Sequence, residues 1–157
     1  MHSPHISIIV VGDELLAGRT VDSNSHFIAA RASACGYDIG SVSIIPDIQK
    51  DIVRAIHASC DVSDIIIITG GLGPTPDDIT RFAVAEAVGR PLVEYCRERA
   101  HIRKRLGSFC ARTRALSEIE AHLPKGSYPI RNQVGIAPGF RLSCKGKLIF
   151  VIPGVPR

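Results

Sequence analysis

The sequence contains no apolar run close to the roughly 18 residues that a membrane-spanning helix needs. Its first residues, MHSPHISIIVVGDE, lack the layout of a secretory signal peptide. The five cysteines are scattered and none stands in a CxxC pair, which argues against a disulfide framework and against a zinc site. We therefore expect a soluble cytoplasmic protein with reduced thiols and no membrane contact.

A strong net charge is also missing, since the chain carries only +4 at neutral pH. Residues 97–114 nevertheless contain seven Lys or Arg and one Glu. No aromatic interleaving and no groove-reading motif accompanies these basic residues, which argues against nucleic acid as a partner. The segment instead predicts either a solvated helical face or a surface that binds a phosphate-bearing ligand.

What the sequence does contain is an alternation of strand and helix patterns. Short apolar runs predict strands, and segments with N-cap residues or an apolar stripe predict helices. The order is strand 6–11, helix 22–36, strand 38–45, helix 48–60, strand 64–69 and helix 77–89. The last strand is apolar throughout, which is typical of a strand buried on both faces.

The second half is less regular. Helical patterns cover 93–106 and 114–123, and residues 140–153 read as two strands joined by a turn at Lys145 and Gly146. With 157 residues and no internal repeat, we expect a single domain over 1–157. The predicted fold class is α/β: a three-layer αβα sandwich with a mainly parallel sheet plus an antiparallel hairpin.

A glycine-rich segment, TGGLGPTPDD, follows the most hydrophobic strand. Gly70, Gly71 and Gly73 lack a Cβ, so their backbone N–H groups can approach a phosphate closely. Thr75 fits the N-cap of the next helix, and Asp78 fits its third position. A carboxylate beside a phosphate requires a cation between them, so we expect a hard divalent cation such as Mg²⁺.

A purely structural interpretation stays open at this point. Glycines after a strand often form only a tight turn, and an aspartate in a first helical turn often only complements the helix dipole. The segment matches neither the Walker pattern nor GxGxxG.

Two other strand ends carry polar residues to the same edge of the predicted sheet. The first strand is followed by acidic, hydroxyl and amide side chains, and Asp47 follows the second strand. Convergence of such side chains on one edge is what an active site in this architecture requires. The candidates after the first strand are Asp13, Glu14, Ser23 and Asn24, with Asp22 beside them.

The motifs GDELLAG, DSN, TGGLGPTPDDIT, NQVGIAPGF and PGVP stand in this order along nearly the whole chain. In this the chain resembles the molybdopterin-binding-like domain at the N-terminus of CinA-type competence/damage-inducible proteins, which is related to MogA and MoaB. The resemblance implies a molybdopterin-binding-like fold and a homo-oligomer, either a dimer or a trimer. It also implies that the amidohydrolase domain of full-length CinA is absent here.

The resemblance further implies phosphoanhydride chemistry. CinA-type domains are metal-dependent ADP-ribose pyrophosphatases that release AMP and ribose 5-phosphate, whereas MogA-type relatives transfer adenylate onto molybdopterin. It places Asp47 and Asp78 at the metal and in catalysis. Gly70, Gly71, Gly73 and Thr75 would hold phosphate, and Asp13, Glu14, Ser23, Asn24 and Gly139 would line the pocket.

Three functions stay open. The first is a pyrophosphatase of the ADP-ribose type, favoured because Leu72 and Asp77 stand where MogA and MoaB relatives carry Thr and Arg. The second is a pterin-binding or adenylyl-transfer protein. The third is a non-catalytic nucleotide-binding module, because SEIEA at 117–121 departs from the Asn-x-Lys/Arg-Gln-Ala pattern: Ile119 takes the basic position and Glu120 the amide position.

Overall fold

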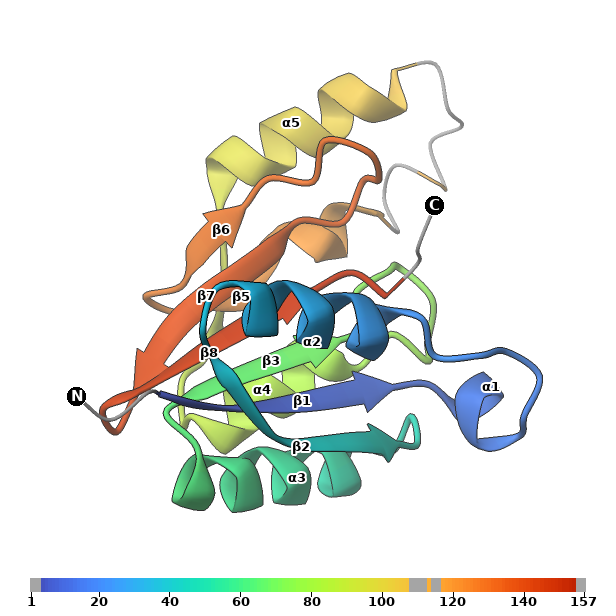
Figure 1. Cartoon of the computed structure of the whole chain (residues 1–157). Coiled ribbons are helices and arrows are strands. Elements are labelled where there is room, and N and C mark those ends of the chain that lie inside the picture. The colour runs from blue at the N-terminus through green and yellow to red at the C-terminus, as the bar shows by residue number, and fades with distance from the viewer. Residues whose placement is uncertain (1–3, 108–112, 114–116, 155–157) are drawn as a thin grey trace.

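The computed structural model describes residues 4–107, 113 and 117–154. The first half alternates strands and helices as the sequence predicts, and the second half adds short strands and one long basic helix (Figure 1). The elements are β1 His5–Val11, α1 Asp13–Leu16, α2 Asn24–Ala34, β2 Asp38–Ile45, α3 Gln49–Val62, β3 Ile65–Thr69, α4 Thr80–Ala87, β4 Leu92–Glu94, α5 Cys96–Leu106, η1 Ile119–Ala121, β5 His122–Pro124, β6 Tyr128–Ile130, β7 Gly139–Cys144 and β8 Lys147–Ile152.

The main sheet has six strands in the order β2-β1-β3-β8-β7-β6. Strands β2, β1, β3 and β8 are parallel, whereas β7 runs antiparallel to both β8 and β6. The predicted hairpin is confirmed, and its turn places Lys145 and Gly146 at φ 49° and 77°. The α/β fold with a mainly parallel sheet and an antiparallel hairpin is therefore confirmed.

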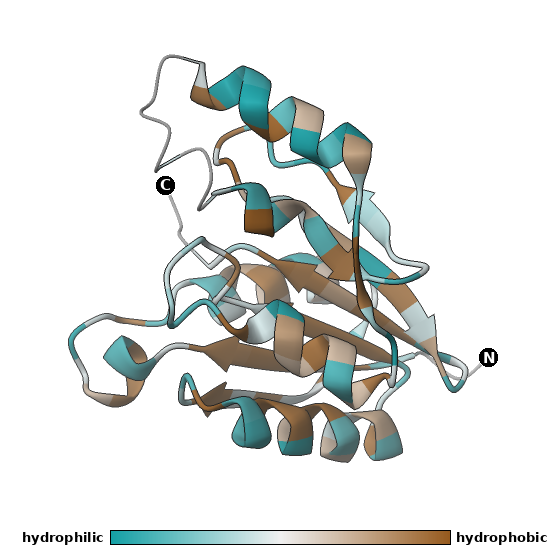
Figure 2. Ribbon diagram, turned by 180° about the vertical axis from the view of Figure 1, so that it is seen from behind, coloured by the Kyte–Doolittle hydropathy of each residue, from teal (hydrophilic) through white to brown (hydrophobic). Residues whose placement is uncertain are grey.

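The helices cover both faces of this sheet, and the alternation of side chains along β1 shows why. Ile6, Ile8 and Val10 pack with α2 on one face. Ile9 and Val11 point to the other face, into the larger core formed with α3 and α4. Every second residue of a strand lies on the same face, so an uninterrupted apolar strand needs a helix on each side. Figure 2 shows the hydrophobic strands between helices of mixed character.

The chain reverses its direction across the sheet at β1. Strand β2 lies on one side of β1 and strand β3 on the other. Right-handed connections then place α2 and α3 on opposite faces, and the segments that leave the carboxyl ends of β1 and β3 lead to helices on opposite faces of the sheet. In open α/β sheets this switch point is where ligands bind.

Several sequence predictions need correction. The helix predicted over 77–89 begins at Thr80, and the helix predicted over 93–106 begins at Cys96 because residues 92–94 form β4. The helix predicted over 114–123 ends differently: residues 119–121 form a short 3-10 turn and 122–124 form β5, paired with β4. Residues 114–116 lie outside the described part. None of the described helices is long and apolar enough to cross a lipid bilayer.

Candidate functional site

A cavity of about 1140 Å³ lies at the carboxyl ends of the first three strands. The loops after β1, β2 and β3 form one side, and residues 134–137 together with Arg105 contribute further wall. Most of the residues predicted from the sequence are brought together here: Asp13, Glu14, Ser23, Asn24, Asp47, Gly70, Gly71, Gly73 and Asp78 all line it. The convergence expected from three separate strand ends is therefore present.

The glycine loop (residues 70–73) needs glycine for two reasons. Gly70 and Gly71 adopt φ values of 106° and 62°, which side chains rarely adopt. A Cβ on Gly70 would lie 2.2 Å from the carbonyl oxygen of Val11, and a Cβ on Gly71 would lie 2.3 Å from Thr80 Oγ1. The loop therefore packs directly against the end of β1 and the start of α4.

The carbonyls of this loop are held on the side of α4. The N–H of Thr80 donates to the carbonyl of Gly71 at 3.1 Å. The buried guanidinium of Arg81 donates through Nη2 to the carbonyl of Leu72 and, at 3.0 Å, to that of Gly73. In a trans peptide the N–H points opposite to the preceding C=O. The N–H groups of Leu72 and Gly73 therefore point away from α4, and no described residue accepts a hydrogen bond from either.

Thr75 and Asp78 form a closed turn rather than the predicted N-cap. Asp78 Oδ2 accepts hydrogen bonds from the Thr75 N–H at 2.9 Å and from Thr75 Oγ1 at 2.6 Å. The N–H of Asp78 donates back to the Thr75 carbonyl at 3.0 Å. The turn delays the start of α4 to Thr80, whose N–H is already bonded to the glycine loop. The prediction that Thr75 caps the helix is therefore wrong, and Thr75 does not line the cavity.

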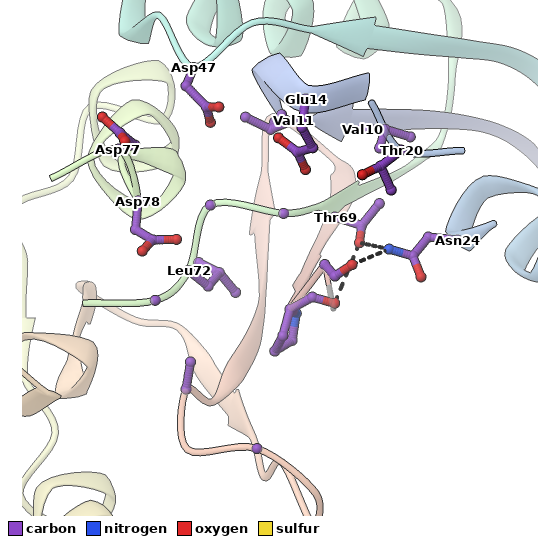
Figure 3. Close-up of a pocket in the computed structure, with 18 of the residues that line it drawn as sticks. Val10, Val11, Glu14, Thr20, Asn24, Asp47, Thr69, Leu72, Asp77 and Asp78 are labelled. Carbon is purple, nitrogen blue, oxygen red and sulfur yellow. Dashed lines mark hydrogen bonds between the residues drawn. The ribbon is translucent and has the colours of Figure 1, made fainter. Parts of the chain in front are cut away.

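The acidic side chains of the cavity fall into two groups by their contacts, and Figure 3 labels four of them, Glu14, Asp47, Asp77 and Asp78. In the first, the N–H of Asp13 donates to Asp47 Oδ2 at 2.9 Å and the N–H of Asp47 donates to Asp13 Oδ1 at 3.1 Å. Burial raises the pKa of Asp47, the backbone hydrogen bond from Asp13 lowers it, and the charges of Asp13, Glu14 and Asp77 raise it further. These bonds tie the loops after β1 and β2 together.

The second group consists of the carboxylates of Asp78 and Glu120, whose charges act on the guanidinium of Arg81. Arg81 is 1% exposed and its desolvation lowers its pKa, an effect that the charges of Glu120 and Asp78 oppose. Glu120 is 2% exposed and lines the cavity, and its Oε2 has no partner among the described residues. Burial raises the pKa of Glu120 to about 7, with Arg81 lowering it and Asp78 raising it.

Asn24 joins the start of α2 to the ends of two strands. Its Nδ2 donates to the carbonyl of Gly154 at 2.6 Å and to Thr69 Oγ1 at 3.3 Å (Figure 3). Asp22 accepts a hydrogen bond from the N–H of Ser25 at 3.0 Å, which satisfies an N–H in the first turn of α2. The DSN segment therefore positions the wall of the cavity beside β3 and β8.

Gly139 does not reach the cavity. It is buried in β7, where a Cβ would lie 2.7 Å from the carbonyl oxygen of Val151. Glycine is needed there for strand packing. Arg81 is a residue that the sequence analysis missed, and its signal is an arginine in the helix pattern ITRFAVAEAV, where Thr80 and Glu86 are the other polar residues.

A divalent cation, as expected from the sequence, would need ligands in addition to the carboxylates of the cavity. No group of three or more His, Cys, Asp or Glu among the described residues is arranged to hold a metal ion by itself. Mg²⁺, however, commonly binds through one or two carboxylates together with ligand phosphates. Asp47, in the loop after β2, and Asp78, in the turn before α4, offer such carboxylates in one cavity. The divalent cation therefore stays a prediction, and its remaining ligands would come from the bound phosphate.

Comparison with known proteins assigns the chain to a family. The family described as "Probable molybdopterin binding domain" matches residues 7–157. A protein of Pyrobaculum calidifontis is 38% identical over 157 residues, which cover 98% of this chain and 59% of that protein. A "Putative competence-damage inducible protein" of Halothermothrix orenii is 37% identical over 153 residues, which cover 96% of this chain and 36% of that protein. The chain thus spans less than two thirds of the length of these relatives.

Solved structures of related proteins support the same family assignment. CinA from Thermoplasma acidophilum has a TM-score of 0.91 and 34% identity, covering 98% of this chain and 90% of that one. MoaB from Thermus thermophilus, a molybdopterin biosynthesis enzyme, has a TM-score of 0.64 and 21% identity, covering 98% and 82%, and shows the shared fold alone. The chain therefore belongs to the molybdopterin-binding domain family, as a domain of the CinA N-terminal type related to MoaB and MogA.

Proposed function

We propose that the cavity binds a phosphorylated pterin or nucleotide, with one phosphate at the glycine loop and a divalent cation between that phosphate and the carboxylates of Asp47 and Asp78. The observation that carries this proposal is the orientation of the loop: its carbonyls are bonded on the side of α4, which leaves the N–H groups of Leu72 and Gly73 for an anion. The family match supports a ligand of this class.

The described residues have separate tasks in this proposal. Arg81 holds the loop carbonyls and so keeps the N–H groups in place. Asp78 has its Oδ2 bonded to Thr75, which fixes the carboxylate beside the loop. Asp47 comes from the loop after β2, and its orientation is set by the hydrogen bond from the N–H of Asp13. A bound cation would supply neutralisation of the charge on the phosphate oxygens.

An enzyme that binds a phosphorylated ligand in this way would cleave or form a phosphoanhydride bond. The motif resemblance to CinA-type domains favours the ADP-ribose pyrophosphatase reaction, which yields AMP and ribose 5-phosphate. The family match favours pterin binding instead. Adenylyl transfer is the catalytic alternative that goes with pterin binding. Both share the phosphate and cation positions proposed here, so binding is the step to test first.

The test is calorimetric titration of the purified protein with ADP-ribose and with a phosphorylated pterin, each with Mg²⁺ and with EDTA. We expect saturable binding that requires Mg²⁺ and is lost in Asp78→Asn. Asp61→Asn, an exposed aspartate of α3 outside the cavity, is the matched control and should bind like the wild type. Absence of saturable binding of either ligand by the wild type would contradict the proposal.

Product analysis separates the two chemistries. Release of AMP and ribose 5-phosphate from ADP-ribose in the presence of Mg²⁺, abolished by Asp78→Asn, would establish the pyrophosphatase. Tight binding of the phosphorylated pterin without turnover of ADP-ribose would place the protein with the pterin-binding relatives instead.

A further inference from the structure

We propose that Arg105 binds a second anionic group of the ligand, such as a second phosphate, and so favours diphosphates over monophosphates. This inference rests on the proposed function. The described lining of the cavity contains two basic side chains, Arg19 and Arg105. The acidic side chains of the lining are Asp13, Glu14, Asp22, Asp47, Asp77, Asp78 and Glu120.

Such a lining repels phosphates. One cation between the carboxylates and the glycine loop neutralises one phosphate, but a second phosphate in the same cavity stays near uncompensated carboxylates. A diphosphate therefore needs a positive side chain elsewhere on the wall. Arg105 occupies the wall formed by the end of α5 and residues 134–137.

The guanidinium of Arg105 is fixed in place without losing its charge. Its Nη1 donates to the carbonyl of Gln133 at 3.0 Å, and its Nη2 donates to the carbonyl of Val134 at 2.9 Å. A guanidinium has five N–H groups, so about three are left for a ligand. An arginine held in this way presents a planar fork to a phosphate without the entropy cost of ordering the side chain.

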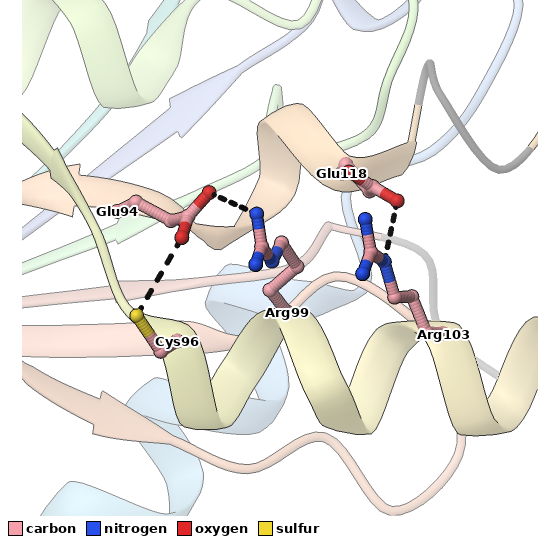
Figure 4. Close-up of polar contacts among 5 residues, drawn as sticks. All are labelled: Glu94, Cys96, Arg99, Arg103 and Glu118. Atoms are coloured by element: carbon pink, nitrogen blue, oxygen red, sulfur yellow. Dashed lines mark hydrogen bonds and ion pairs between the residues drawn. The ribbon is translucent and has the colours of Figure 1, made fainter.

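The neighbouring arginines of α5 are engaged differently (Figure 4). Arg99 forms an ion pair with Glu94 at 2.9 Å, and Arg103 forms one with Glu118 at 2.6 Å. Arg105 contacts neutral carbonyls, and no described carboxylate pairs with it. Of these three arginines, Arg105 is the one that brings an uncompensated charge to the cavity.

The loop beside Arg105 is itself well ordered by hydrogen bonds. Asn132 Oδ1 accepts from the N–H groups of Val134 at 3.0 Å and Gly135 at 2.8 Å, and its Nδ2 donates to the carbonyl of Ala137 at 3.1 Å. Arg105 therefore donates its hydrogen bonds to a turn that is itself held by the side chain of Asn132. Arg19 and Arg105 are both exposed, but the guanidinium of Arg19 has no hydrogen bond to a described residue.

The experiment measures the Kd of AMP and of ADP, with Mg²⁺, for the wild type, Arg105→Ala, Arg105→Gln and Lys104→Ala. Lys104 lies next to Arg105 on α5 but outside the cavity lining, so its variant is the matched control. Arg105→Gln keeps a donor for the loop carbonyls and removes the charge. Loss of one charge-assisted contact should weaken ADP about 10- to 100-fold in both Arg105 variants. AMP should change less than about threefold in both Arg105 variants, and Lys104→Ala should change neither ligand.

Equal weakening of AMP and ADP in Arg105→Gln would show that Arg105 only supports the loop, and would overturn the inference. Unchanged ADP binding in both variants would overturn it as well. If the wild type binds neither AMP nor ADP, the inference fails together with nucleotide binding itself. Binding of AMP by the wild type therefore distinguishes failure of this inference from failure of the proposed function.

Discussion

Glu120 should make the protein less stable as the pH rises, and replacing it with glutamine should remove this effect. The residue is 2% exposed, and burial raises the pKa of its carboxyl from 4.5 to about 7. A carboxyl whose pKa is raised by folding stabilises the protein below its unfolded pKa, and this contribution is lost as the pH rises through the folded pKa. The difference between the two values corresponds to at most about 3 kcal/mol.

The assay is urea unfolding of the wild type and Glu120→Gln at pH 5, 6, 7 and 8. Glutamine is neutral throughout, so the free energy of unfolding of the variant relative to the wild type should rise by about 2–3 kcal/mol between pH 5 and pH 8. Glu86→Gln, at an exposed position of α4, should show no such trend. A wild type that gains stability over Glu120→Gln as the pH rises would refute the reasoning, because it would mean that Arg81 fully compensates the ionised carboxylate.

Three further predictions concern the glycine loop and the assembly. Gly70→Ala should lose at least about 2–3 kcal/mol in urea unfolding, because its Cβ would meet the Val11 carbonyl oxygen, whereas Gly36→Ala, with φ 81° and open space, should lose about 1 kcal/mol. Equal losses would contradict the close approach. Arg81→Met should weaken phosphate-ligand binding at least tenfold by releasing the loop carbonyls, measured by calorimetry on folded protein; unchanged affinity would contradict its positioning role. The dimer or trimer implied by the family resemblance should appear in light scattering, and a monomer at micromolar concentration would contradict it.

The central strands and their helices could be predicted because burial on two faces imposes a readable pattern. The isoleucine run of β3 and the stripe containing Ile52 and Ile56 in α3 both enter the core as expected. The strands β4, β5 and β6 have three residues each, too few for a pattern to show. The sequence predicts the start of α4 three residues too early, because the residues of the Thr75–Asp78 turn resemble an N-cap.

The site could be predicted only in part, for a related reason. Carboxylates and glycines at strand ends converge by topology, so Asp47, Asp78 and Gly70 could be assigned to one edge without knowing any contact. Arg81 is buried by tertiary packing, and an arginine in a helix otherwise suggests an exposed face. Arg105 is one of many basic residues in its segment, and only its place at the cavity wall distinguishes it.

The N–H groups of Leu72 and Gly73 test the central claim most directly. In ¹H–¹⁵N correlation spectra of the labelled protein, ADP-ribose with Mg²⁺ should shift both signals saturably, with the Kd found by calorimetry. The signals of Gly36 and Gly146, which lie in turns outside the cavity, should stay in place. Saturable binding that leaves the Leu72 and Gly73 signals unmoved would contradict a phosphate position at the glycine loop.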